Sequence, residues 1–250
     1  MSIRYPSTSL RLFCLPHAGG NTMHFHGWAG WLPATVEVVP VDLPGHGTRL
    51  REPLKDGWQP LIDDLVDLVA RRIDGPYALF GHSLGALAAY DVARSLTERR
   101  EPPELLLVAG RNAPGAPATH RPIRDLPDDQ FLDALIRLGG TSAAIRHQPE
   151  LLEMYLPLLR TDIRLAECYT SRPGAVLPCP LVAFAGRRDR MTDPAGVLAW
   201  HRETRATFEL VLMDAGHFFL GDPEFTGACG ALVAQVLAGR TDPTGVGQRP

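Results

Sequence analysis

The pentapeptide Gly81-His82-Ser83-Leu84-Gly85 places a serine between two glycines. A short apolar run, residues 77–80, precedes it, and an Ala- and Leu-rich stretch, residues 84–96, follows. A strained turn between a strand and a helix exposes such a serine hydroxyl. The first N–H groups of the helix carry partial positive charge and can stabilise an anion beside that hydroxyl. The pattern therefore predicts Ser83 as the nucleophile of an acyl transfer, with the N–H of Leu84 as one oxyanion donor.

A serine nucleophile needs a base within hydrogen-bonding reach and a carboxylate that orients the base. Asp189 and His217 each follow a predicted strand directly. Both should then lie at the edge of a parallel sheet where Ser83 emerges. The chain order serine, acid, histidine is that of the α/β-hydrolase fold. We predict a catalytic triad of Ser83, Asp189 and His217.

Several neighbouring residues compete for these roles. Asp193 precedes Pro194 and is expected to cap a helix. Asp214 lies three residues before His217 and would reach its ring poorly. The side chain of His82 should point away from the nucleophile. The alternative that the pentapeptide is an ordinary turn with an exposed serine stays open.

Alternating apolar runs and helical patterns predict a mostly parallel central sheet flanked by helices. Strands are expected at residues 10–15, 36–41, 77–80, 104–109, 181–185 and 208–212. Helices are expected at residues 58–73, 84–96, 128–138, 150–169, 195–204 and 224–237. This is the α/β-hydrolase pattern, in which the loop after the first strand gives the second oxyanion N–H, here that of Ala18.

Residues 112–172 contain helical patterns and no strand candidate, which predicts a helical lid inserted between two strands. Gly139-Gly140 should be its most flexible point. Whether its excess apolar residues line a pocket or pack on the sheet stays open. We expect one domain over residues 1–240 and a disordered tail over residues 241–250.

Composition narrows the class of protein. The 250 residues carry a net charge of −3 and no long basic run, which gives no reason to expect nucleic-acid binding. Four widely spaced cysteines suggest reduced thiols in a cytoplasmic protein, and no apolar run is long enough to span a membrane. His24 and His26 lack partners at metal-ligand spacing. We expect neither a metal nor a cofactor.

Residues 10–237 resemble the type II thioesterases that accompany polyketide and nonribosomal peptide synthases in antibiotic biosynthesis. The resemblance rests on motifs along the whole stretch: Leu15-Pro16-His17-Ala18-Gly19-Gly20, Leu43-Pro44-Gly45-His46-Gly47-Thr48-Arg49, the serine pentapeptide, Gly110-Arg111-Asn112-Ala113-Pro114, Leu138-Gly139-Gly140-Thr141, Leu156-Pro157-Leu158-Leu159-Arg160-Thr161-Asp162, Gly186-Arg187-Arg188-Asp189 and Gly216-His217-Phe218-Phe219. One departure is Arg190 after the acid, where proline would be common.

The resemblance implies a cytoplasmic thioesterase that removes stalled or wrong acyl groups from the phosphopantetheine arm of an acyl or peptidyl carrier protein. It also implies that the carrier is acidic where partners dock, so Arg187, Arg188 and Arg190 could steer it. Solvated surface charges are the plainer explanation of these arginines.

Other functions stay open at this point. The same triad would serve an acyl-CoA thioesterase or a carboxylesterase. A non-catalytic carrier-binding module is a further alternative, against which the ordered triad argues. A terminal thioesterase domain is not expected, because the chain has no room for a carrier domain before Leu10.

Overall fold

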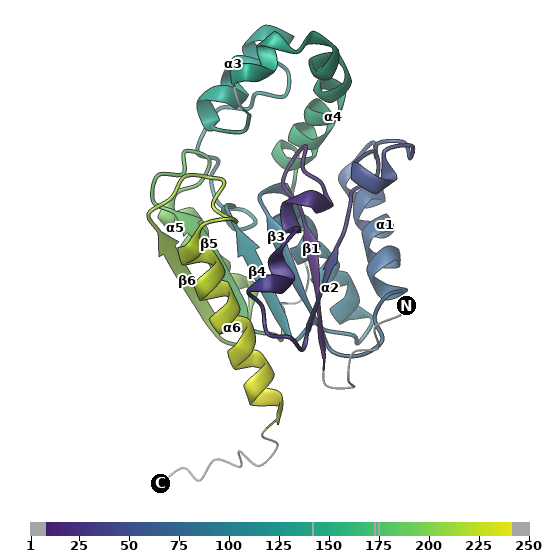
Figure 1. Ribbon diagram of the computed structural model, residues 1–250, viewed down its shortest axis with the longest axis vertical. Coiled ribbons are helices and arrows are strands. Elements are labelled where there is room, and N and C mark those ends of the chain that lie inside the picture. The colour runs from purple at the N-terminus through teal and green to yellow at the C-terminus, as the bar shows by residue number, and fades with distance from the viewer. Residues whose placement is uncertain (1–8, 142, 173, 175, 242–250) are drawn as a thin grey trace.

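The computed structural model describes residues 9–141, 143–172, 174 and 176–241 (Figure 1). Six strands form one sheet in the order β2-β1-β3-β4-β5-β6, and every pairing is parallel. The strands are β1 (Leu10–Leu15), β2 (Val36–Pro40), β3 (Tyr77–His82), β4 (Leu105–Ala109), β5 (Leu181–Gly186) and β6 (Phe208–Met213). All six expected strands are present, and the parallel sheet of the predicted fold is confirmed.

Helices cover both faces of this sheet, so its central strands are buried on both sides. The helices α1 (Trp58–Ala70) and α2 (Leu84–Glu98) pack on one face, where Phe13 and Leu79 point. The helix α6 (Pro223–Thr241) lies across the other face (Figure 1). There Phe80 and Phe225 meet among the aromatic rings of the second core cluster. The two packed faces fix the strand ends that carry the site.

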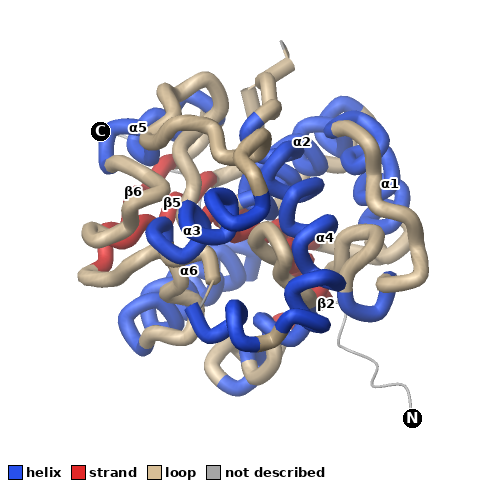
Figure 2. Tube along the Cα trace, turned by 90° about the horizontal axis from the view of Figure 1, so that it is seen from above, coloured by secondary structure: helices blue, strands red, loops and turns tan. Residues whose placement is uncertain are grey.

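The described residues between β4 and β5 contain no strand of the sheet; their regular elements are α3 (Asp128–Leu138), a 3₁₀ turn (Ala143–His147) and α4 (Pro149–Glu167). These helices, here called the α3–α4 segment, stand beyond the carboxyl edge of the sheet (Figures 1 and 2). They share a small core of their own that includes Phe131, Leu159 and Ile163. Gly139, with φ of 82°, ends α3 in the left-handed conformation.

Element boundaries differ from the sequence predictions where local chemistry intervenes. The expected helix 195–204 is instead α5 (Pro194–Leu198) followed by a 3₁₀ turn (Ala199–Glu203). Periodicity missed the 3₁₀ turns Thr22–Phe25, Trp28–Gly30 and Gly47–Arg49, which are too short to show a pattern. Helix α6 continues to Thr241, the first residue of the tail predicted over residues 241–250, and the rest of that tail, residues 242–250, lies outside the described residues. Among the helices of the described chain, none has the length and apolarity needed to cross a membrane.

Candidate active site

Ser83 stands between the end of β3 and the start of α2, in a strained backbone conformation. Its φ of 57° and ψ of −112° lie in the left-handed half of conformational space, which non-glycine residues rarely enter. A Cβ at Gly81 would collide with the backbone carbonyl of Gly85, and one at Gly85 with that of Leu15. Both glycines are therefore required by close backbone packing. Ser83 is 6% exposed, and its backbone N–H donates to Ala109 at 2.8 Å.

His217 and Asp189 form a buried hydrogen-bonded pair. The Nδ1 of His217 lies 2.8 Å from Oδ2 of Asp189, which also accepts from the hydroxyl of Thr192. The backbone N–H of Met191 donates to the other carboxylate oxygen at 2.7 Å. Burial alone would raise the pKa of Asp189, but the hydrogen bond and charge of His217, with the two local donors, lower it below its ordinary value. An ionised Asp189 holds the proton of His217 on Nδ1 and leaves Nε2 as the basic nitrogen.

Ser83, His217 and Ala18 all line one small, partly open cavity of about 40 Å³. Apolar side chains of the α3–α4 segment complete its wall, namely Leu135, Leu138, Leu159 and Ile163. Among the described residues no hydrogen bond joins the Ser83 hydroxyl to His217. Such contacts often tighten only when substrate binds. Some apolar residues of the segment thus line a pocket while others pack together.

The two expected oxyanion donors differ in their surroundings. Ala18 lines the cavity, and its N–H has no acceptor within the described chain. Leu84 is fully buried and does not line the cavity, but it is the first residue of α2, and its N–H also lacks an acceptor among the residues described. Unpaired N–H groups on both sides of Ser83 can bind a developing anion.

Asp193 and Asp214, the two alternatives to Asp189 as the orienting acid, have partners other than His217. Asp193 caps α5, accepting from Gly196 at 2.9 Å, as the sequence indicated. Asp214 is exposed and forms an ion pair with Arg188. Only Asp189 touches the ring of His217 among the carboxylates of the described chain.

Sequence reasoning missed a chain of imidazoles behind the site. His82 is fully buried, and its Nε2 donates to the backbone carbonyl of His217 at 2.9 Å. Its Nδ1 lies 3.3 Å from Nδ1 of His17. Burial lowers the pKa of His17 to about 3, helped by the charges of His24 and His217, and also holds the pKa of His82 well below its ordinary value. Neutral imidazoles therefore join the loops that carry Ala18, Ser83 and His217.

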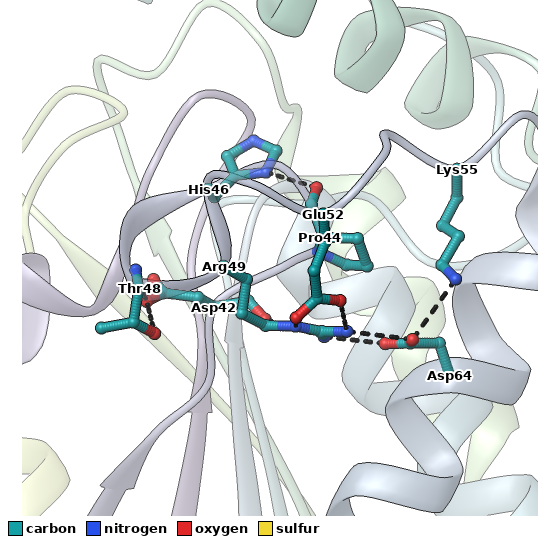
Figure 3. Close-up of polar contacts among 8 residues, drawn as sticks. All are labelled: Asp42, Pro44, His46, Thr48, Arg49, Glu52, Lys55 and Asp64. Carbon is teal, nitrogen blue, oxygen red and sulfur yellow. Dashed lines mark hydrogen bonds and ion pairs between the residues drawn. The ribbon is translucent and has the colours of Figure 1, made fainter.

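A second buried pair, His46 with Asp162, was not predicted. Nε2 of His46 lies 2.8 Å from Oδ2 of Asp162, and both side chains are 2% exposed. The loop after β2 that carries His46 is held by its own polar network around Asp42, Arg49 and Asp64 (Figure 3). The available signal was an acidic residue inside the apolar stripe of α4, where Ile163 and Leu165 are buried.

Two further observations concern a second hollow and the possibility of a metal site. A larger hollow of about 480 Å³ lies on the outer side of α4, bordered by Trp58, Arg164 and Cys168, and it contains none of the predicted catalytic residues. Within the described residues, no group of three or more His, Cys, Asp or Glu side chains is arranged to hold a metal ion.

A family model described as a thioesterase domain matches residues 10–234. The chain belongs to the thioesterase family. It is 40% identical over 219 residues to the thioesterase PikA5 of Streptomyces venezuelae, covering 87% of this chain and 78% of that one.

Two solved structures agree with this assignment. The RedJ thioesterase from the prodiginine pathway of Streptomyces coelicolor is 37% identical with a TM-score of 0.81, over 95% of this thioesterase and 90% of that chain. The type II thioesterase BorB from the borrelidin cluster is 36% identical with a TM-score of 0.81, over 92% and 93% of the two chains. The predicted resemblance to type II thioesterases and the α/β-hydrolase fold are confirmed.

Proposed function

We propose that this thioesterase hydrolyses acyl groups from the phosphopantetheine arm of an acyl or peptidyl carrier protein, and so frees stalled or mis-primed polyketide or nonribosomal peptide synthases. The strained serine beside a buried His–Asp pair, in one cavity with a free backbone N–H, is the observation that supports it most. The relatives named for the prodiginine and borrelidin pathways support the biosynthetic setting.

The mechanism we propose is acyl transfer through Ser83. Its Oγ attacks the thioester carbonyl while Nε2 of His217 takes the hydroxyl proton. The tetrahedral oxyanion accepts hydrogen bonds from the N–H groups of Ala18 and Leu84, each worth roughly 3 kcal/mol in the transition state. The carbon–sulfur bond breaks, and His217 returns its proton to the departing thiolate. Water then attacks the acyl-serine, again losing a proton to His217, and the carboxylic acid leaves with Ser83 restored.

Replacing Ser83 with alanine tests this mechanism, because the side chain is small and the backbone turn is kept. The Ser83→Ala variant should retain the fold by circular dichroism and lose turnover of an acyl-carrier substrate. It should also lose labelling by a fluorophosphonate probe. Undiminished hydrolysis by this variant would contradict the covalent mechanism.

A second experiment tests the carrier substrate. The same acyl group is offered on a carrier protein, on coenzyme A and on an oxygen ester, and kcat/KM is compared. We expect the carrier-bound form to be preferred. A preference for the coenzyme A form or the oxygen ester would instead indicate an acyl-CoA thioesterase or a carboxylesterase.

A further inference from the structure

Asp162 connects the α3–α4 segment to the loop that carries Ala18. Its Oδ2 accepts the backbone N–H of Gly19 at 2.7 Å and faces Nε2 of His46 at 2.8 Å. Gly19 follows Ala18 directly, and a Cβ on Gly19 would press against Leu159 of α4. The loop that carries Ala18 is thus hydrogen-bonded to α4, a helix of the α3–α4 segment.

The hydrogen bonds around His46 define its charge. Nδ1 of His46 lies 3.0 Å from the backbone carbonyl of Pro44, which can only accept, so Nδ1 carries a proton (Figure 3). Nε2 faces a carboxylate oxygen to which Gly19 already donates. A bare nitrogen there would repel that oxygen, whereas a protonated one donates to it. Both ring nitrogens therefore carry protons, and His46 is the cation of a buried ion pair.

The charges around His46 favour this state. Burial lowers the pKa of His46, but the hydrogen bond and charge of Asp162, the carbonyl of Pro44 and the charge of Asp42 together raise it above its ordinary value. Asp162, on α4, contacts the ring directly, whereas Asp42, after β2, acts on it through its charge and is hydrogen-bonded to Thr22 and Thr48. Breaking such a pair leaves an uncompensated buried charge, which is strongly destabilising.

We propose that Asp162 is a positioning residue for catalysis: it fixes the loop of Ala18 through Gly19, so that the oxyanion site is complete only while α4 is seated on His46. The inference rests on the proposed function, because it assigns a catalytic task to the N–H of Ala18. The proposal also links closure of the cavity to completion of the oxyanion site. The same helix closes the cavity through Leu159 and Ile163 and completes the anion-binding site.

The Asp162→Asn variant tests the proposal with a small thioester, the acetyl thioester of N-acetylcysteamine, as substrate. The amide oxygen of asparagine can still accept a hydrogen bond but carries no charge to balance the His46 cation, so the joint anchor of α4 and the Gly19 loop is weakened. We expect kcat to fall roughly 10- to 100-fold while KM changes less than about threefold, since misplacing one oxyanion donor acts on the transition state. An unchanged kcat in a folded Asp162→Asn enzyme would overturn the proposal.

The pH dependence gives a readout that a merely structural role would not move. As the pH rises through the raised pKa of His46, its Nε2 loses the proton that binds Asp162, so kcat of the parent should decline on the alkaline side. His46→Gln still offers an N–H to Asp162 but does not titrate. This variant should recover turnover relative to His46→Ala and lack that alkaline decline. A His46→Gln enzyme with the parent's alkaline decline would overturn the proposal even if Asp162→Asn fails to fold.

Arg160→Gln provides a matched control on the same helix. Arg160 donates to the backbone carbonyls of Arg124 and Leu126, both within residues 112–172, and neither touches Gly19 nor lines the cavity. We expect a lower melting temperature and a kcat–pH profile of the parent's shape. The same profile change as in the His46 variants would overturn the proposal in favour of general loosening. Retained activity of Ser83→Ala in this assay would instead refute the proposed function.

Discussion

Two buried His–Asp pairs in the described part of the chain share a 2.8 Å contact but differ at the other ring nitrogen. In the His217–Asp189 pair, the second ring nitrogen has no partner in the described chain and belongs to a ring that lines the cavity. In the His46–Asp162 pair, the second ring nitrogen is hydrogen-bonded to the carbonyl of Pro44. Distance and burial therefore do not separate the two pairs. The unbonded nitrogen is what suits His217 to the proposed role of base, and the fully bonded ring suits His46 to the proposed structural role.

The largest expected effect comes from breaking the first pair. Asp189→Asn should reduce kcat on the order of 10⁴-fold, because the amide would favour the wrong tautomer of His217. The measurement is steady-state turnover, with melting temperature as a check of folding. Asp193 caps α5 and accepts from Asn112 without touching His217, and asparagine also caps helices well, so Asp193→Asn should leave kcat within a few-fold of the parent. A larger loss of kcat in Asp193→Asn than in Asp189→Asn would mean that Asp193, and not Asp189, is the orienting acid.

Lowering the pH distinguishes the neutral imidazoles of His17 and His82 from the charged imidazole of His46. His17 and His82 have lowered pKa values in the folded state, so the unfolded chain binds more protons below about pH 6.5. Stability should therefore fall as the pH falls from 6.5 towards 5, by about 2 kcal/mol for His17, and His82 should add to this loss. The melting temperature should drop by at least about 4 °C over this range. His82→Gln should flatten the curve, and an equally steep curve would contradict this assignment.

The positive charge of His46 predicts the opposite dependence on pH, a stability that falls as the pH rises. Its pKa is raised in the folded state, so its stabilisation is fully present below about pH 6.5 and is lost as the pH rises through the folded pKa. We expect a decrease in melting temperature of roughly 2–4 °C over the alkaline range. Thermal denaturation of the parent and of His46→Gln from pH 6.5 to 9 measures it, with a smaller change expected in the variant. A parent curve that rises with pH would mean that His46 is neutral.

The smallest effect concerns the surface beside the first pair. Arg187 and Arg190 are exposed next to Asp189 and have no side-chain ion pair within the described residues, whereas Arg188 pairs with Asp214. The double variant Arg187→Glu with Arg190→Glu should raise KM for a carrier-bound substrate roughly 3- to 10-fold and weaken its salt dependence. Turnover of a small thioester should barely change. Equal losses on both substrates would indicate damage around Asp189 instead of lost docking.

Much of this architecture could be predicted from the sequence because short-range patterns carry it. The apolar runs that became β1 and β3, and the glycines around Ser83, reflect local constraints on a buried strand and a tight turn. Asp189 and His217 could be placed because parallel strands end at one edge of the sheet. Their roles stay predictions, and their geometry agrees with them.

The remaining features depend on partners that are distant in the chain. Asp162 and His46 come from different elements, and nothing in the spacing of either residue indicates the other. The contact of His82 with the carbonyl of His217 is equally long-range. Where the expected helix 195–204 divides, Trp200 is fully buried and donates to the backbone carbonyl of Arg111, a contact between residues far apart in sequence.

The strand order also has a consequence for biosynthesis of the protein. Strands β1, β2 and β3, with the strained turn at Ser83, are synthesised before β5 and β6, which supply Asp189 and His217. Domains generally fold as units, so this one is complete only after its last strand has left the ribosome. A half-made chain carries Ser83 without the acid and the base of the proposed triad. On the proposed mechanism, thioester hydrolysis therefore begins only when β6 has joined the far edge of the sheet.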